Sequence, residues 1–297
     1  MEKTIHFITG MPRGGATLLN NILAQNPRFH LASPPGILEV MYQARHRWNR
    51  VVEIKASPNE PGKVRVLRGM LARYYSGETV PQPVVFDKSR GWLGLLEMAE
   101  LVLERPAKVL VPVRDVRDVM ASFERLWQQN KDFRAAMEKS LPPMPKDTPK
   151  IPLDTPEQRC AVWARAEQPV GLAFNRIRDA LARGFGDRMH FVEYEQLTRD
   201  PERTLSAIYK FLGETPFAHD FKNVKHVTWD VDEMLMYRVP GLPQVRPKVE
   251  PQQPRWPTVF GSWISKYVSS NAVWEQVRKT GGSGTAATLS SAPPTIG

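Results

Sequence analysis

Cysteine is almost absent from this 297-residue sequence, in which Cys160 is the only one. A single cysteine excludes an internal disulfide framework and any metal site built from several thiolates. The sequence also has no apolar run close to the ~20 residues that a membrane-spanning helix needs. These absences predict a protein of a reducing compartment, the cytoplasm, with no membrane span.

Runs of like charge are absent too, although the formal net charge is +10. Excess positive charge favours an anionic partner, and charge alone leaves nucleic acid, a membrane surface and a small polyanion open. The lysines and arginines are scattered without a run of five, and the zinc-finger, RNP and basic-zipper signatures are absent. We therefore expect no nucleic-acid partner.

Alternating strand and helix patterns make up most of the chain. Apolar runs predict β-strands at 4–9, 83–87, 108–114 and 189–194. Helical patterns lie between them, at about 16–26, 36–48, 61–76, 92–104, 116–130 and 156–183. Strands that are almost continuously apolar are typical of a parallel sheet covered on both faces. The pattern predicts a three-layer α/β fold with a central parallel sheet and ligands at the carboxyl ends of the strands.

Proline-rich stretches interrupt this alternation. We expect loops at 140–156 and 239–257, the second of them basic, and a short helix at about 259–279. We predict one domain over 1–280 and a disordered tail of small and polar residues over 281–297.

The stretch GMPRGGATLL, which begins at Gly10, has the form of a phosphate-binding loop without its lysine. Gly10 and Gly15 match the G-x-x-x-x-G-K-[ST] spacing and Thr17 its hydroxyl position, but Ala16 replaces the lysine. Backbone N–H groups at such a helix N-terminus form an anion site. Arg13 could supply the missing charge as a bidentate donor to phosphate or sulfate. The alternative is a glycine-rich turn that only connects a strand to a helix.

A second anion-binding pattern follows the third predicted strand, in VPVRDVRDVMASF. Arg114 ends the strand, and Ser122 lies about two turns into the next helix. An arginine and a hydroxyl that converge could clamp a phosphate. The alternative is a surface cluster in which Arg114 pairs with Asp115 or Asp118.

Together, PRGGATLL and VRDVRDVMASF resemble the sulfotransferase family. The first is similar to the PRSGTTLL loop that binds the 5′-phosphosulfate end of 3′-phosphoadenosine 5′-phosphosulfate (PAPS). The second is similar to the segment that binds the 3′-phosphate of this donor, and FVEYEQLTRDPERTLSAIYKFLG resembles a third family feature. The resemblance covers about residues 5–213 and implies PAPS as co-substrate without a metal. It implies sulfuryl transfer to a hydroxyl or amine of a small-molecule, carbohydrate, lipid or peptide acceptor, and it leaves the oligomeric state open.

The resemblance also implies which residues bind the donor. By motif these are Arg13, Gly14, Gly15, Ala16, Thr17 and Leu18 at the 5′ end, Arg114 and Ser122 at the 3′-phosphate, and Tyr194, Arg246 and Lys248 around the nucleotide. From the residues alone, Tyr194 could equally pack in the core, and Arg246 and Lys248 could be solvated charges. Two hydroxyl groups of the family loop are lost at Gly14 and Ala16, so backbone N–H groups carry more of the binding.

Catalysis of sulfuryl transfer needs cations where charge grows on the departing phosphate oxygen. Arg13 is the first candidate for this role. Lys88 is the second, because it resembles a lysine that heparan-type and cytosolic sulfotransferases place after the corresponding strand. The alternative for Lys88 is a surface lysine balanced by Asp87.

The general base is missing from the places where the family has it. Protein-tyrosine sulfotransferases carry a glutamate about where Ser33 and Pro34 fall, and cytosolic enzymes carry a histidine where Arg90 stands. Glu39 is the candidate nearest to the first of these places. The rivals are His30, His46 and Asp87, because a base must reach the acceptor hydroxyl and the sequence does not give that distance.

Two other functions stay open at this point. A P-loop kinase or nucleotide hydrolase would need the absent loop lysine and a carboxylate-held magnesium. A nucleotide-binding module without catalysis is compatible with the missing base.

Overall fold

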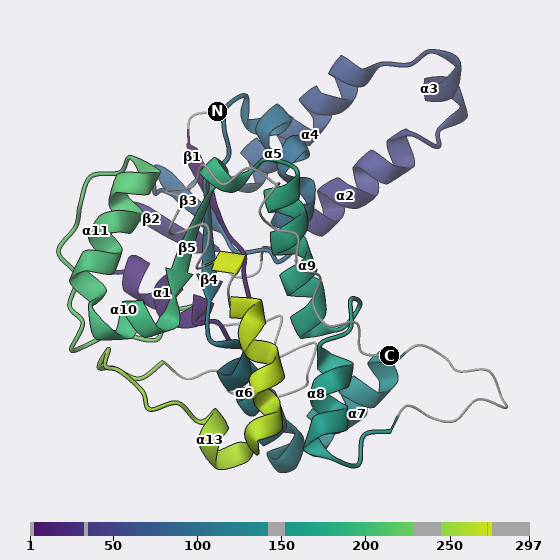
Figure 1. The fold of residues 1–297 in the computed structure, drawn as a ribbon. Coiled ribbons are helices and arrows are strands. Elements are labelled where there is room, and N and C mark those ends of the chain that lie inside the picture. Colours follow the sequence, from purple (N-terminus) through teal and green to yellow (C-terminus); the bar gives the residue numbers. More distant parts are fainter. Residues whose placement is uncertain (1–2, 33–34, 142–151, 229–244, 272, 275–297) are drawn as a thin grey trace, which may run out of the picture.

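A parallel sheet of five strands forms the centre of the molecule (Figure 1). The computed structural model describes residues 3–32, 35–141, 152–228, 245–271 and 273–274. The strand order is β2-β3-β1-β4-β5. The strands are β1 (Thr4–Ile8), β2 (Phe29–Ala32), β3 (Val84–Asp87), β4 (Val109–Val113) and β5 (Met189–Glu193). The predicted α/β class with a central parallel sheet is therefore confirmed.

Strand β2 is the one strand of this sheet that the sequence pattern does not predict. Its sequence, FHLA, is short and contains a histidine, and only Phe29 in it is buried. It pairs with β3 alone, at the edge of the sheet, with Phe29 opposite Val84 and Ala32 opposite Asp87. A strand at the edge of a sheet has fewer neighbours to cover it, so it does not need the continuous apolar run that predicts the other four strands.

Helices connect the strands and cover both faces of the sheet. They are α1 (Ala16–Leu23), α2 (Ile37–Trp48), α3 (Val52–Ala56), α4 (Glu60–Tyr74), α5 (Leu96–Leu103), α6 (Val116–Gln129), α7 (Lys131–Ser140), α8 (Pro156–Trp163), α9 (Pro169–Ala182), α10 (Tyr194–Arg199), α11 (Pro201–Leu212) and α13 (Trp256–Val259). Three 3₁₀ helices are η1 (Trp92–Leu95), η2 (Gly186–Arg188) and η3 (Ser262–Asn271).

Two predicted helices show how local sequence sets their ends. The helix expected over 156–183 is two helices, because the chain turns after Trp163 and Pro169 then occupies the first turn of α9. Helix α11 begins where Asp200 accepts a hydrogen bond from the Arg203 N–H (3.1 Å), and it ends at Gly213, whose φ is 70°.

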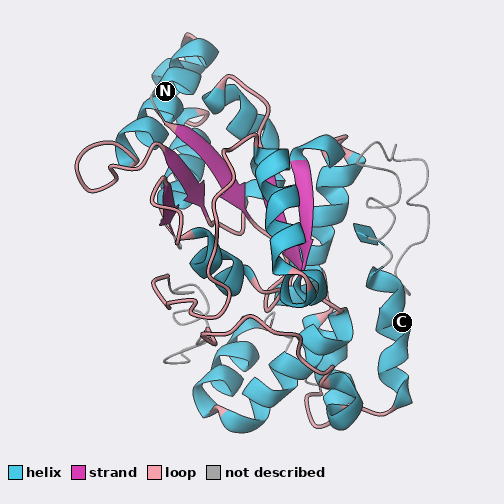
Figure 2. Cartoon of the chain, turned by 90° about the vertical axis from the view of Figure 1, so that its left-hand side faces the viewer, coloured by secondary structure: helices cyan, strands magenta, loops and turns pink. Residues whose placement is uncertain are grey.

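Alternate side chains of the strands enter two separate cores. One core contains Ile5, Val85 and Val111 together with α2, α4, α5, α6, α8 and α9. The other contains Ile8 and Leu110 together with α1 and α11. Figure 2 shows the strands flanked by helices on both sides, which is the predicted three-layer arrangement.

The carboxyl ends of β1 and β4 lie side by side in the middle of the sheet, where β1 pairs with β4 and the chain order reverses. Ligands of open α/β sheets bind at such a point. The chain after β1 stays in contact with β4, because the Met11 N–H donates to the Pro112 carbonyl (2.9 Å). A side chain at Gly10 would place Cβ 2.2 Å from that carbonyl oxygen, so only glycine fits there.

Several predicted segments fall outside the described residues. These are 142–151 of the first proline-rich loop, 239–244 of the second and the predicted tail over 281–297. The domain boundary at residue 280 stays a prediction.

Candidate functional site

A pocket of about 430 Å³ opens at the carboxyl ends of β1, β3 and β4. Its walls come from the loop after β1, the segment after β3, helices α6 and α10, and residues 245–255. Eight basic side chains line it: Arg13, Lys88, Arg90, Arg114, Arg125, Arg246, Lys248 and Arg255. The one carboxylate among the described lining residues, Glu250, lies 2.9 Å from the Lys248 ammonium group. The pocket is therefore strongly cationic and suits an anionic ligand.

The loop after β1 leads directly into the N-terminus of α1. Gly15 caps this helix with φ 93°, and a Cβ there would lie 2.7 Å from Tyr194 Cδ2. The first N–H groups of a helix have no partner within the helix, so those of Ala16, Thr17 and Leu18 are available to an anion at this wall of the pocket. Gly14 is not part of the pocket wall, because it packs against the Met11 and Pro112 carbonyls.

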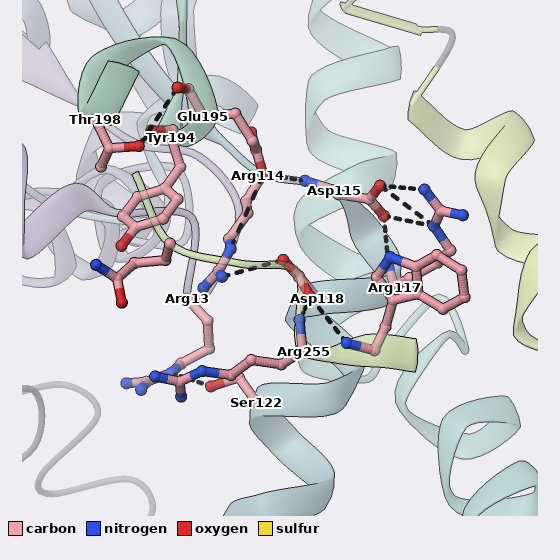
Figure 3. Close-up of polar contacts among 12 residues, drawn as sticks. Arg13, Arg114, Asp115, Arg117, Asp118, Ser122, Tyr194, Glu195, Thr198 and Arg255 are labelled. Carbon is pink, nitrogen blue, oxygen red and sulfur yellow. Dashed lines mark hydrogen bonds and ion pairs between the residues drawn. The ribbon is translucent and has the colours of Figure 1, made fainter. Parts of the chain in front are cut away.

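Arg13 connects the loop to helix α6. Its backbone adopts φ 60°, and its Nε donates a hydrogen bond to Ser122 Oγ over 3.0 Å (Figure 3). These two residues are 109 positions apart in the sequence. The structure therefore brings the two predicted anion-binding motifs into direct contact.

Arg114 lies in the same pocket and is held on several sides. Its Nη2 is 3.1 Å from Asp118 Oδ2, and its guanidinium carbon is 4.4 Å from the centre of the Tyr194 ring. The nearest Glu195 oxygen is 4.0 Å from Arg114 Nε, and burial raises the pKa of that carboxyl group. Among the described residues no hydrogen-bond acceptor reaches the buried Nε of Arg114. Arg114 thus pairs with Asp118, which is the alternative that the sequence left open, and it also lines the pocket.

Asp118 ties residues 245–255 to this wall of the pocket. Its Oδ1 accepts hydrogen bonds from the N–H groups of Arg255 (2.8 Å) and Trp256 (3.1 Å), as Figure 3 shows in part. This contact brings Arg255 into the pocket beside α6. Burial, followed by the charges of Arg125 and Arg114, lowers the pKa of Arg255. Like charges that are held together in this way favour a bound anion.

The predicted donor-closing residues Arg246 and Lys248 also line the pocket. Both side chains are exposed, and Arg246 hydrogen-bonds Gln252 while Lys248 pairs with Glu250. Tyr194 lines the pocket as well, at the start of α10. Its ring packs on the loop at Gly15 and under Arg114, so it is a wall of the pocket rather than a core aromatic.

Lys88 is a buried pocket residue with only 7% of its surface exposed, which excludes the surface-lysine alternative. Asp87 precedes it at the end of β3 and is completely buried. The Asp87 carboxylate accepts hydrogen bonds from Tyr75 (2.9 Å) and Ser89 (2.7 Å). Burial raises the pKa of Asp87. Because its hydrogen bonds are buried, the Asp87 side chain anchors the segment after β3.

The structure does not bring Glu39 to the pocket. Its side chain is exposed on α2 and accepts a hydrogen bond from Gln43 at 2.7 Å. The rivals His30 and His46 are not part of the pocket wall either. Glu39 as general base stays a prediction.

Three arginines of the pocket were not among the sequence candidates: Arg90, Arg125 and Arg255. Arg125 follows Ser122 by three residues on α6, and side chains at that spacing share a helix face, so the spacing alone could have indicated it. Arg90 follows Lys88 by two residues after a strand. Nothing local distinguishes Arg255, which reaches the pocket through the Asp118 contact.

We also searched the described residues for clusters of metal ligands and for membrane-spanning helices. In the part of the chain that the structure describes, no three histidine, cysteine or acidic side chains gather in a way that could hold a metal ion. No described helix is both long and apolar enough to cross a bilayer.

Comparison with known proteins gives a family and a fold. A family model described as the sulfotransferase family matches residues 6–219, whereas no curated protein matches. The solved sulfotransferase domain from the curacin biosynthetic pathway matches with a TM-score of 0.53 and 17% identity, over 94% of this chain and 98% of that one. This likeness supports the same fold.

Two further solved structures match with lower TM-scores. The sulfotransferase domain from the Synechococcus PCC 7002 olefin synthase has a TM-score of 0.48 and 20% identity, over 94% of this chain and 95% of that one. Retinol dehydratase in complex with retinol and PAP has a TM-score of 0.43 and 14% identity, over 94% of this chain and 82% of that one. Because the family model spans well over half of the sequence, including both anion-binding motifs, the chain belongs to the sulfotransferase family.

Proposed function

We propose that this protein transfers a sulfuryl group from PAPS to a hydroxyl or amine group of an acceptor. One observation carries the proposal: the hydrogen bond between Arg13 and Ser122 joins a helix N-terminus and an arginine-serine clamp in a single cationic pocket. A ligand that fills such a pocket needs anionic groups at two separated positions. PAPS has a 3′-phosphate and a 5′-phosphosulfate.

The 3′-phosphate is assigned to the α6 side of the pocket. Ser122 supplies a hydroxyl group, and Arg114 supplies the positive charge of its guanidinium group. Arg125 and Arg255 add charge at the same wall. A phosphate monoester carries about −1.5 to −2 charges at pH 7, so several arginines around it are favourable.

The 5′-phosphosulfate is assigned to the loop after β1. Its oxygens accept from the N–H groups at the start of α1, and the helix dipole adds favourable potential. Thr17 is the one side-chain hydroxyl in this loop, since Gly14 and Ala16 have none. Arg13 and Lys88 supply positive charge at the two sides of the loop.

The chemical step is an in-line displacement at sulfur. The acceptor oxygen or nitrogen forms a bond to sulfur while the bond between sulfur and the 5′-phosphate oxygen breaks. The electron pair of that bond stays on the phosphate, and the acceptor proton is released. Lys88 and Arg13 stabilise the charge that grows on the departing oxygen, in a pocket where burial strengthens the interaction. Glu39 lies outside the pocket wall and stays a predicted base that this scheme does not use, so the acceptor proton passes to water.

Calorimetric titration with adenosine 3′,5′-bisphosphate (PAP), the product of the donor, tests the binding half of this proposal. We expect PAP to bind at least ten times more tightly than ADP or ATP, and Arg114→Ala to remove most of that difference. Equal affinity of the wild type for PAP and ATP would contradict the proposal. Magnesium-dependent ATP turnover by the pure protein would favour a kinase or hydrolase instead.

Transfer from [³⁵S]PAPS to an acceptor mixture tests the catalytic half. Lys88→Ala is expected to lower kcat by about 10²-fold or more while PAP affinity changes little, since it acts on charge that develops in the transition state. PAP binding without any transfer would favour a nucleotide-binding module without catalysis.

A further inference from the structure

The backbone at Arg90 is held by hydrogen bonds from two other parts of the chain. Its carbonyl accepts from Thr9 Oγ1 at the end of β1 (3.1 Å) and from Arg176 Nη1 on α9 (3.1 Å). Thr9 is itself a buried residue of the pocket wall. Arg90 is therefore fixed relative to the loop after β1.

The residues on both sides of Arg90 are fixed as well. The Lys88 N–H donates to the Ala32 carbonyl of β2 over 3.1 Å. A Cβ at Gly91 would lie 2.9 Å from Leu38 Cδ2, so α2 packs closely against this segment. Together with the buried Asp87 side chain, these contacts make residues 87–91 a rigid support for Lys88 and Arg90.

A second arginine lies behind Arg90. Arg176 is half-buried on α9, and burial, followed by the charge of Arg90, lowers its pKa. Because the Arg176 guanidinium group lies 3.1 Å from the Arg90 carbonyl, its positive charge adds to that of Arg90 in this part of the protein, and an anion beside Arg90 reduces the repulsion between the two. The arrangement favours a bound negative group at Arg90.

This pair lies on the opposite side of β1 from the proposed 3′-phosphate site. Arg90 follows β3, whereas Arg114 and Ser122 follow β4, and β1 with its loop lies between these two strands. A donor that spans from the loop toward α6 leaves the β3 side to the molecule that attacks sulfur. Arg90 is thus on the acceptor side of the pocket.

We infer that the acceptor carries an anionic group, such as a carboxylate, near the hydroxyl or amine that receives the sulfuryl group, and that Arg90 binds this group with Arg176 behind it. The inference rests on the proposed function. It makes Arg90 a specificity-determining residue and hydroxylated or aminated acids the acceptor class.

The test compares matched acids and amides as probes. The pairs are 4-hydroxybenzoate with 4-hydroxybenzamide, and 6-hydroxyhexanoate with 6-hydroxyhexanamide. Binding of each is measured by calorimetry to the full chain saturated with PAP, and transfer is measured with [³⁵S]PAPS. In at least one pair we expect the acid to bind about tenfold more tightly than the amide and to have the higher kcat/KM.

Variants assign this preference to a residue. Arg90→Gln is expected to remove the preference for the acid while PAP affinity stays within about twofold, and Arg90→Lys to keep most of it. Arg125→Gln is the matched control on the donor side, where we expect weaker PAP binding and an unchanged preference. If Arg90→Gln does not fold, Arg176→Gln and Arg90→Lys are compared instead, with a reduced preference expected in the first.

The outcomes separate this inference from the proposed function. Failure of the wild type to bind PAP overturns the proposed function. If the wild type binds PAP, three results overturn this inference and leave the proposed function intact. These are amides that bind as well as acids, no binding by either member of any pair, and a preference for acids that survives in Arg90→Gln.

Discussion

Arg13 combines a strained backbone with a functional contact. A positive φ is rare for residues with a side chain, and in the described part of the chain only Arg13 and Glu104 have one without being glycine. Such a conformation costs on the order of 1 kcal/mol and persists where the surroundings enforce it. Here the residue with this conformation is the one whose side chain donates to Ser122.

Arg13→Ala and Ser122→Ala should therefore act as one unit on donor binding. Each single change is expected to lower PAP affinity by about tenfold, and the double change to cost clearly less than the sum of the two, since both remove the same hydrogen bond. Calorimetry on the four proteins measures this coupling. Fully additive losses would mean that the contact contributes nothing to binding.

Gly15 is required for two independent reasons. Its φ of 93° disfavours any side chain, and a Cβ there would overlap the Tyr194 ring. Gly15→Ala is expected to lower the free energy of unfolding by about 1–3 kcal/mol and to weaken PAP binding, because the loop must shift.

Gly69→Ala is the control for this glycine. Gly69 lies within α4, and a Cβ added there would meet no other atom within 4 Å, so alanine should be neutral or stabilising by up to about 1 kcal/mol. Thermal unfolding and calorimetry measure both variants. Equal effects of the two changes would mean that the loop adapts freely.

At the level of single residues, the sequence predicted contacts that lie near one another in a motif. Arg114 and Ser122 are eight residues apart on a strand end and the next helix, so their place in one pocket follows from helix geometry. Arg255 could not be predicted, because only the fold brings it beside α6. The role of Glu39 rested on its position along the chain, which does not determine whether a side chain reaches the pocket.

Among the structural elements, helix α6 links several parts of the site. It provides Ser122 and Arg125 to the pocket, and Asp118 on the same helix binds both Arg114 and the backbone at Arg255. One buried carboxylate thus positions an arginine of the pocket, which we propose binds the donor, and a segment distant in sequence. Loss of the Asp118 carboxylate should therefore disturb both Arg114 and residues 245–255.

Two substitutions at Asp118 separate these tasks. Asp118→Asn keeps an oxygen for the two backbone N–H groups and removes the negative charge beside Arg114, so a moderate loss of PAP affinity is expected. Asp118→Ala removes both interactions, and removing one partner of a buried ion pair costs about 3–5 kcal/mol. We expect faster proteolysis within residues 245–256 in Asp118→Ala only. Equal proteolysis of both variants would show that the charge, and not the backbone contacts, holds this segment.

The elements themselves were largely predictable where burial leaves a strong pattern. The inner strands β1, β3 and β4 and the edge strand β5 are apolar runs and were predicted, whereas the other edge strand, β2, was not. Helices α8 and α9 were predicted as one helix because the pattern continues across the break. Pro169 carried the signal, since the residue before a proline disfavours helix.

Partly or fully buried histidines should make the whole molecule sensitive to mild acid. Burial lowers the pKa of His6, His30, His190 and His219. Below about pH 6.5 the histidines bind protons in the unfolded chain but not in the folded one. Stability therefore falls as the pH falls through the histidine pKa of the unfolded chain. Each excluded proton contributes up to about 1.4 kcal/mol per pH unit.

His190→Phe tests this at one site. The ring stacks on Phe211 with centroids 5.2 Å apart, and phenylalanine can keep that contact without titrating. The fall in melting temperature from pH 7.5 to 5.5 should be smaller in the variant than in the wild type. Carboxyl groups with raised pKa values, such as Asp87, have the opposite effect, because they stabilise the folded chain as the pH falls. This effect is the same in the variant and the wild type, so the difference between the two proteins cancels it. Identical falls would mean that His190 binds its proton equally in both states.

Residues 245–255 form the last wall of a pocket whose other walls come from residues 8–18, 88–90, 114–125 and 194–198. During synthesis, the chain released up to residue 219 contains every strand of the sheet but none of this last wall. Domains begin to fold as they emerge from the ribosome. Affinity for the donor should therefore appear after the sheet, near the end of translation, and prematurely terminated chains should not withdraw nucleotide from the cellular pool.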